Sequence, residues 1–210
     1  MKAVTKSDWL VPMGLIALTL VPMAAGIVRL LQVTGGAAVT AENARFMTAP
    51  VPVIVHILSV LPFCIFGALQ FSGGLRSRLP VLHRTMGRVL VPLGLAAAGS
   101  GLWMTLTYPW PPGDGVVLYY MRIVVGVLML GFIAVGFMAA LGRNYRSHSA
   151  WMTRGYALGL GAGTQVLTHV PWFLLVGKPD EVARIYLMGA GWVINLLVAE
   201  WVIHRRLKRG

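Results

Sequence analysis

Apolar residues along this chain gather in long runs that short polar stretches separate. Several of these runs exceed the ~18 residues that mark a membrane-spanning helix. The pattern predicts six such helices, at residues 9–31, 51–71, 85–107, 115–141, 150–176 and 183–204. Turn-forming residues lie between them, as in YPWPPGDG and VGKPDE, and support these boundaries. We therefore expect an all-α, polytopic membrane protein that forms a single integral membrane domain over residues 1–210.

The composition agrees with a membrane protein. Hydrophobic residues make up 57% of the chain and charged residues only 11%, whereas soluble domains contain about 25% charged residues. The net charge of +12 would also suit a nucleic-acid-binding protein. The basic residues, however, lie at the ends of predicted helices, as is typical of membrane proteins, so we exclude nucleic acid as a partner.

The basic residues are unequally divided between the two sides of the predicted bundle. If the N-terminus lies inside, most of them fall on the inner side: Lys2, Lys6, Arg76, Arg78, Arg84, Arg88, Arg143, Arg146, Arg154, Arg205, Arg206, Lys208 and Arg209. The outer side holds the smaller set Arg29, Arg45, Arg122, Lys178 and Arg184. Because basic loops stay in the cytoplasm, we expect both termini to be cytoplasmic.

Two similar turns connect four of the predicted helices. The first turn contains His83 and Arg88, and the second contains His148 and Arg154. In each turn the histidine precedes the arginine by five or six residues, at the start of an apolar run. This repeat predicts two similar helical hairpins that form a central four-helix bundle over residues 51–176. The helices at 9–31 and 183–204 would then be peripheral.

Small residues are spaced regularly in two of these helices. Gly155, Gly159 and Gly163 recur every four residues, and Gly94, Ala98 and Gly101 form a similar stripe. Such stripes let helix backbones approach closely within a membrane, and they also leave room for a flat cofactor. We favour the helix-packing interpretation.

Three ionisable residues are predicted to lie at one depth in the outer half of the membrane. His56, Arg122 and His169 each lie roughly 7–11 Å below the outer interface, at the rise of an α-helix. Facing lipid would cost each of them several kcal/mol, so we expect them to converge inside the bundle. Paired neutral imidazoles are the usual axial ligands of b-type haem iron, and a buried arginine offsets the charge of the haem propionates. The candidate ligands of the haem iron are therefore His56 and His169, and the candidate partner of the propionates is Arg122. The alternative is a hydrogen-bonded cluster of these residues that fixes helix register.

A second polar group is predicted near the inner interface. It consists of His83 and His148 with Arg84, Arg88 and Arg154. These residues could ligate a second haem, or bind an anionic lipid headgroup or a quinone. His148 and His169 would lie about 31 Å apart along one helix, further than suits paired haem ligands, so we favour the headgroup interpretation.

The two turns also carry a resemblance to a known family. The matching residues are His56, then Leu82, His83, Arg84, Gly87 and Arg88, then His148, Trp151, Met152, Arg154 and Tyr156. They resemble an uncharacterised bacterial family of predicted integral membrane proteins, catalogued as domain of unknown function 2306. The resemblance implies a multi-pass protein of the bacterial inner (cytoplasmic) membrane. Four histidines on a four-helix core also resemble the layout of dihaem b-type membrane cytochromes, which is an analogy only.

Three functions remain open from the sequence. The first is a haem-binding electron-transfer protein that exchanges electrons with quinone and serves a redox partner or a larger membrane complex. The second is a non-redox membrane subunit or scaffold whose inner arginines bind lipid headgroups. The third, a small transporter, is weaker because Glu200 is the only candidate carboxylate for proton coupling. No hydrolase motif is found, so any enzyme would be a membrane oxidoreductase component.

Overall fold

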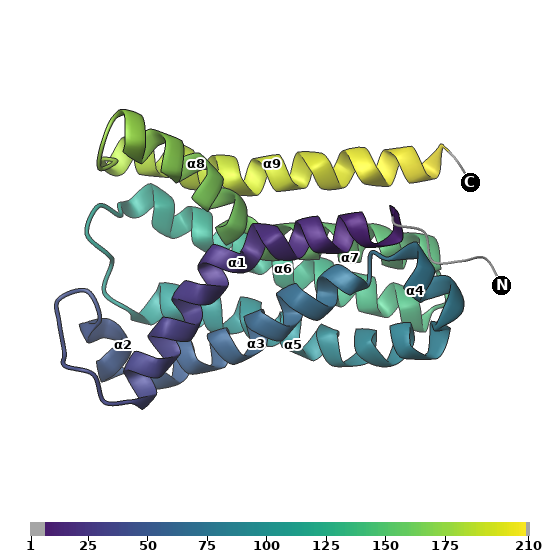
Figure 1. Cartoon of the computed structure of the whole chain (residues 1–210), viewed down its shortest axis with the longest axis horizontal. Coiled ribbons are helices and arrows are strands. Elements are labelled where there is room, and N and C mark those ends of the chain that lie inside the picture. Colours follow the sequence, from purple (N-terminus) through teal and green to yellow (C-terminus); the bar gives the residue numbers. More distant parts are fainter. Residues whose placement is uncertain (1–6, 209–210) are drawn as a thin grey trace.

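The computed structural model describes residues 7–208, and every regular element in that range is an α-helix. The long helices run roughly parallel to the long axis of the molecule (Figure 1). In chain order the helices are α1 (Ser7–Thr34), α2 (Ala44–Thr48), α3 (Pro50–Leu69), α4 (Gly73–Arg78), α5 (Pro80–Thr107), α6 (Val116–Leu141), α7 (Tyr145–Gly159), α8 (Gly161–Leu175) and α9 (Glu181–Leu207).

Five of these helices, α1, α3, α5, α6 and α9, are long and apolar enough to cross a membrane. Each overlaps one of the predicted spans, so the prediction of an all-α protein with several membrane-spanning helices is confirmed. The agreement is closest for α6, because a glycine before it and another after it limit the apolar run.

The predicted continuous span at 150–176 is wrong. The chain forms two helices there, α7 and α8, which meet at Leu160. Each contains 15 residues, or about 22 Å of helix, which is shorter than the ~30 Å of a bilayer core. Gly159 and Gly161 flank the break, and glycine lowers the cost of interrupting a helix. Five of the six predicted spans are therefore continuous helices that could cross a membrane. The remaining one, at 150–176, is a broken helix.

The break sends the two halves of this segment to different neighbours. Helix α7 packs mainly against α6, whereas α8 packs against α9 and α1. The second predicted hairpin therefore does not repeat the first, in which α3 and α5 lie side by side as continuous helices (Figure 1).

The core lies where α3, α5, α6 and α7 meet. Phe63, Ile133 and Tyr156 are almost completely buried there. A Cβ atom on Gly94 would lie 2.6 Å from the Phe63 ring, and one on Gly159 would lie 2.9 Å from it. The ring thus fits between two helices because both lack a side chain at these positions. These contacts support the helix-packing interpretation of the glycine stripes.

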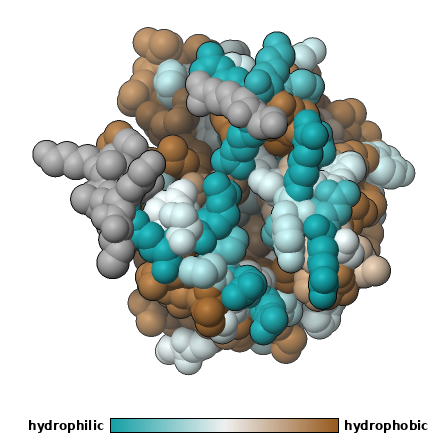
Figure 2. Space-filling view, turned by 90° about the vertical axis from the view of Figure 1, so that its right-hand side faces the viewer, coloured by the Kyte–Doolittle hydropathy of each residue, from teal (hydrophilic) through white to brown (hydrophobic). Residues whose placement is uncertain are grey.

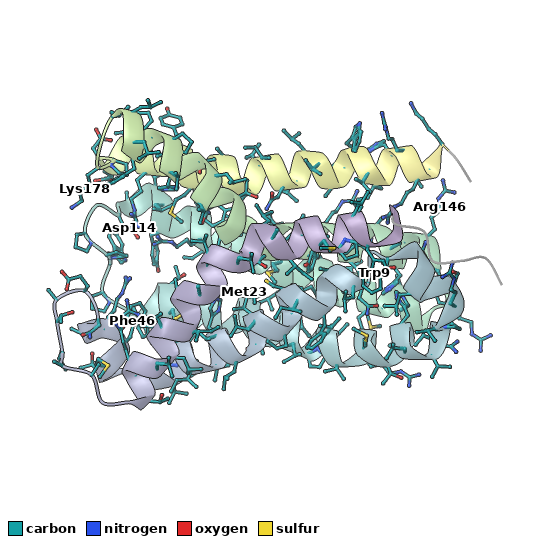
Figure 3. The ribbon with its side chains drawn as sticks, viewed as in Figure 1. Trp9, Met23, Phe46, Asp114, Arg146 and Lys178 are labelled. Carbon is teal, nitrogen blue, oxygen red and sulfur yellow. The ribbon has the colours of Figure 1, made fainter. Side chains whose placement is uncertain are left out.

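The two ends of the bundle differ in chemical character. The start of α1, the helix α4, the start of α7 and the end of α9 share one end, which we name the terminal end (Figure 1). Viewed from that side, its surface carries many hydrophilic side chains (Figure 2). The opposite end, named the loop end, carries Phe46, Asp114 and Lys178, whereas Arg146 lies at the terminal end (Figure 3). A cytoplasmic location for the terminal end remains a prediction from the charge distribution.

Candidate functional site

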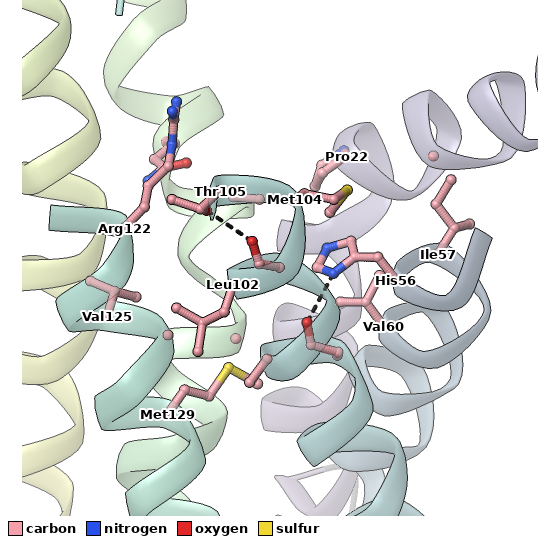
Figure 4. A pocket seen from close by; sticks show the side chains of 18 of the residues that line it. Pro22, His56, Ile57, Val60, Leu102, Met104, Thr105, Arg122, Val125 and Met129 are labelled. Carbon is pink, nitrogen blue, oxygen red and sulfur yellow. Dashed lines mark hydrogen bonds between the residues drawn. The ribbon is translucent and has the colours of Figure 1, made fainter. Parts of the chain in front are cut away.

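A cavity of about 490 Å³ extends from the loop end to the break between α7 and α8. Its walls come from α1, α3, α5, α6 and α8, and α2 and the segment after α5 lie at its mouth. Most of the lining is apolar, including Val60, Leu102, Val125 and Met129 (Figure 4). A few polar side chains interrupt these apolar walls, and they determine what the cavity can bind.

His56 of α3 is the histidine that lines this cavity. Its Nδ1 atom lies 2.9 Å from the carbonyl oxygen of Ala97 and 3.2 Å from the hydroxyl of Ser100 (Figure 4). Because a carbonyl oxygen only accepts hydrogen bonds, Nδ1 carries the proton in the neutral imidazole. The other ring nitrogen, Nε2, then has a free lone pair, and no side chain or backbone group among residues 7–208 bonds to it.

Arg122 of α6 lines the same cavity. Its guanidinium pairs with the carboxylate of Asp114, which also accepts a hydrogen bond from Arg184 Nε of α9 at 2.5 Å. The Asp114 side chain is only 1% exposed, whereas those of Arg122 and Arg184 are about one quarter exposed. One carboxylate therefore holds two arginines in place beside the mouth, and their combined charge remains positive.

Arg45 of α2 adds another positive charge at the mouth. Its guanidinium lies 4.6 Å from the centroid of the Phe46 ring, and that of Arg29 lies 4.4 Å from the same ring. Partial burial lowers the pKa of Arg45, and the positive charge of Arg122 acts in the same direction, although Asp114 opposes both. An anionic group of a ligand would relieve this repulsion between cations.

Aromatic side chains also surround the mouth. Tyr108 donates a hydrogen bond from its hydroxyl to the carbonyl oxygen of Ala49 at 2.5 Å, and its ring packs edge-on against Phe46. The rings of Trp110 and Tyr119 lie 5.3 Å apart. Such rings provide flat surfaces near the interface, where one end of an aromatic side chain meets water and the other meets lipid.

The helix break forms part of the cavity floor, through Leu158, Gly159 and Ala162. Asn195 of α9 donates from Nδ2 to the carbonyl oxygen of Ala157 at 3.0 Å, and its Oδ1 accepts from the Thr164 hydroxyl at 2.6 Å. Irregular backbone within a membrane needs partners of this kind, because lipid offers none. The side chain of Asn195 thus joins the two halves of the broken helix.

The structure brings His56 and Arg122 together and leaves His169 outside their cavity. His169 Nδ1 lies 2.7 Å from the carbonyl oxygen of Gln165 in its own helix. Helix α8 packs on α1 and α9, while α3 packs on α1 and α5, so the break carries His169 away from α3. Among the described residues, His56 lines the cavity and His169 does not. Among residues 7–208, no group of three or more His, Cys, Asp or Glu side chains could hold a metal ion.

The inner group lies at the terminal end. His148 Nδ1 lies 2.8 Å from the carbonyl oxygen of Gly136, and the His83 side chain lies near that of His148. In the part of the chain that the structure describes, His83 Nδ1 and Gln70 Nε2 are buried without hydrogen-bond partners. The two turn histidines are thus neighbours at one end of the bundle.

The arginines of the inner group differ in their surroundings. Arg154 forms a two-pronged ion pair with Glu200, with nitrogen–oxygen distances of 2.5 and 2.9 Å, and lies over the Trp151 ring. Arg84 and Arg88 are exposed on α5. Arg154 is thus engaged within the protein, which weakens its candidacy for lipid binding.

Several residues of the site could not be found from the sequence pattern. Arg45 and Asp114 lie in segments that were interpreted only as connections between helices, and Asn195 lies within an apolar run. In the sequence, these residues stand out only as polar residues next to or within a predicted span. A polar residue in such a position is a candidate partner for a buried group.

The fold and the cavity define the chain as a multi-pass α-helical membrane protein with an internal cavity that is apolar in its depth and basic at its mouth. The model of a family described as predicted membrane protein (DUF2306) matches residues 53–203, and the chain belongs to this family. The expected resemblance is thereby confirmed. No curated protein and no solved structure shows significant similarity to the chain.

Proposed function

We propose that this protein binds an amphipathic molecule inside the membrane, with the polar head of the ligand near Arg45 and Arg122 and its apolar body directed toward the helix break. The observation that carries this proposal is the convergence of Arg45, Arg122 and His56 on one cavity whose walls are otherwise mostly apolar. Its volume of about 490 Å³ falls in the range of small-molecule sites, about 300–1,000 Å³.

The charges at the mouth favour an acidic head. Arginine binds carboxylate and phosphate groups with paired hydrogen bonds, and it loses less hydration energy than lysine when it is partly buried. Asp114 occupies part of the guanidinium surface of Arg122, whereas Arg45 has no acidic partner at ion-pair distance among the described residues. Arg45 is therefore the first candidate for direct contact with an anion.

Haem b is the narrower proposal that uses all three groups. The Ala97 carbonyl oxygen accepts the Nδ1 proton of His56 and so orients the Nε2 lone pair, as hydrogen-bond partners of metal-bound histidines usually do. Arg45 and Arg122 would hold the propionates. Haem would supply one-electron transfer when bound. His169 no longer belongs to this ligand set, so His56 would be the one histidine ligand from this cavity.

A quinone is the second redox candidate. The free lone pair of His56 can accept a hydrogen bond from the hydroxyl of a reduced quinone, and the aromatic mouth offers flat surfaces for its ring. Haem and quinone both lead to membrane electron transfer. The transporter alternative is weaker, because Glu200 is bound to Arg154 and does not line the cavity.

The proposal is tested by purifying the protein from membranes and identifying what it carries. Absorption spectra of the oxidised and dithionite-reduced protein report haem, and mass spectrometry of an organic extract reports quinones and lipids. We expect the His56→Gln and Arg45→Gln variants to lose about tenfold in bound ligand, because each removes a charged or directed contact worth about 1.5 kcal/mol or more.

The His169→Gln variant is the matched control. It removes a histidine of the same predicted depth that lies outside the cavity, and it should retain the ligand. A ligand whose occupancy falls equally in the His56 and His169 variants would contradict the proposed site. The wild type and the His56→Gln variant could also give the same extract and the same spectrum. That result would reject the proposal that the cavity binds an amphipathic molecule.

A further inference from the structure

A second cavity of about 360 Å³ lies at the terminal end, between the start of α7 and the end of α9. Within residues 7–208, it shares no lining residue with the first cavity. Its lining consists of Arg146, Ser149, Ala150, Ile203, Arg206 and Leu207. Two guanidinium groups and a hydroxyl thus meet three apolar side chains, in the part of the molecule where the charge pattern places a membrane interface.

Among the residues whose side chains the structure describes, no acidic group lines this cavity to balance its positive charges. Arg206 donates a hydrogen bond from its guanidinium to the Ser149 hydroxyl at 3.3 Å. The positive charge of Arg76 repels that of Arg206. Glu200, two turns earlier on α9, is already bound by both prongs of Arg154. Like charges held together repel each other, so an anion between them would stabilise this arrangement.

The hydroxyl of Ser149 completes the set of donors. It accepts the hydrogen bond from Arg206, so its own proton is free to donate to another acceptor. Two arginines and a hydroxyl are suited to the oxygen atoms of a phosphate, since guanidinium groups bind phosphate through paired hydrogen bonds.

The apolar side of the cavity indicates where this phosphate comes from. Ile203 is only 6% exposed, and Leu207 follows it one turn later on α9. A free phosphate would gain nothing from such a wall, whereas the acyl region next to a lipid phosphate would be partly shielded by it. Basic pockets between helices at the membrane surface bind anionic headgroups in this way.

We propose that the cavity between α7 and α9 binds the phosphate of an anionic phospholipid, with Arg146 and Arg206 as paired cations and Ser149 as a hydrogen-bond donor. The site is independent of the cavity near His56. It also moves the lipid-binding role, which the sequence pattern assigned to Arg84, Arg88 and Arg154, to two arginines outside that set.

The experiment measures lipid retention by native mass spectrometry after titration of the detergent-purified protein with phosphatidylglycerol or phosphatidylcholine. We expect the wild type to retain phosphatidylglycerol in preference. Arg146→Gln and Arg206→Gln should each weaken that retention about fivefold, because a basic residue near an anionic surface contributes about 1 kcal/mol. The double variant should lose the preference for phosphatidylglycerol.

Arg205→Gln is the matched control. Arg205 precedes Arg206 on α9, carries the same charge, and lies 4.1 Å over the Trp201 ring instead of lining the cavity. Its variant should change retention less than twofold. An equal loss in the Arg205 and Arg206 variants would mean that only the overall charge attracts the lipid, and would overturn the proposal.

Two further measurements separate the remaining outcomes. In one control, inorganic phosphate is added in place of lipid. Binding of inorganic phosphate with the same dependence on Arg146 and Arg206 would show that the acyl chains do not contribute, and would contradict a lipid site. Equal retention of phosphatidylcholine and phosphatidylglycerol would also contradict the proposal. If Arg206→Gln lowers the melting temperature, Arg146→Gln tests the site alone, since Arg146 is exposed at the start of α7.

Discussion

Arg184 Nε donates to Asp114 Oδ1 at 2.5 Å, although the two residues are 70 positions apart in the chain. Asp114 precedes α6, and Arg184 lies in the first turns of α9, so this ion pair ties the two helices together at the loop end. Asp114 also pairs with Arg122. A single carboxylate thereby positions Arg122, one of the arginines that line the first cavity.

Replacing this carboxylate should destabilise the protein strongly. Asp114→Asn leaves two cations without their partner, and removing one member of a buried ion pair costs about 3–5 kcal/mol. We expect the lower end of that range, because both guanidinium groups are partly exposed. Thermal unfolding in detergent measures the effect. Asp180→Asn, which changes only the N-cap of α9, should cost about 1 kcal/mol or less; equal losses in the two variants would refute the shared role of Asp114.

The contact between α1 and α8 should tolerate no side chain on Gly163. A Cβ atom there would collide with the backbone carbonyl oxygen of Leu18, which cannot move aside as a flexible side chain could. We expect Gly163→Ala to destabilise by about 1–3 kcal/mol. Gly99→Ala is the control, because no described residue outside its own helical turn comes within 4 Å of its Cβ position. It should be neutral or stabilising by up to about 1 kcal/mol. Identical unfolding curves for both variants would contradict this packing.

Asn195 should control the order of the helix break. Asn195→Leu removes the donor to the Ala157 carbonyl and the acceptor of the Thr164 hydroxyl, and an unpaired buried polar group costs about 1–3 kcal/mol. We expect faster amide hydrogen exchange in the first turn of α8. Asn144→Ala, which removes the cap of α7, should leave that turn unchanged. Unaltered exchange in the Asn195 variant would show that the break is stable without this side chain.

Tyr108 should make stability depend on alkaline pH. Burial raises the pKa of its phenol above the usual value of 10.0. The folded protein therefore keeps the proton at a pH where the unfolded chain has lost it, so this stabilisation is complete below about pH 10 and is lost as the pH rises through the raised pKa. Tyr108→Phe should lower stability by about 1 kcal/mol near neutral pH and flatten the alkaline decline. Tyr186→Phe is the control, because Tyr186 is 73% exposed. It should change neither the stability near neutral pH nor its decline at alkaline pH.

Gln70 should be replaceable by an apolar residue of similar size. Its Nε2 atom is buried without a hydrogen-bond partner among residues 7–208, and removing an unsatisfied group gains about 1 kcal/mol. Gln70→Met should therefore match or exceed the melting temperature of the wild type. Gln165→Met should lower it, because Gln165 Nε2 donates to the Met188 carbonyl oxygen at 3.1 Å. A loss in both variants would indicate that the Gln70 amide has a bound polar partner.

The hydropathy pattern predicted the membrane-spanning helices well because an apolar run of that length has few alternatives. The predicted span at 115–141 differs from α6 by one residue. The break at Leu160 escaped prediction because residues on both sides of it are apolar. Asn195, which supplies a partner for the backbone there, lies 38 positions after Ala157 and is visible only in the fold.

The site was predicted in part because depth along a helix can be read from sequence, whereas the direction in which a side chain points cannot. His56 and Arg122 were placed at one level, and the structure places them on one cavity. His169 shares that level but follows the break, which turns its helix toward α9. Arg154 was predicted to belong to a headgroup-binding set, but it is paired with Glu200, which comes 46 residues later in the chain.

The backbone approach of Gly163 to Leu18 has a consequence for biosynthesis. The first helix enters the membrane long before its partner exists, because about 145 residues separate the two positions. At roughly 5–20 residues per second, translation of that interval takes about 7–30 s. During this time α1 lacks its contact with α8, and α3 is the other helix that packs closely on it. Docking of α8 on α1 is therefore a late step of assembly, and among the described helices only α9, which packs on α8, comes later in the chain.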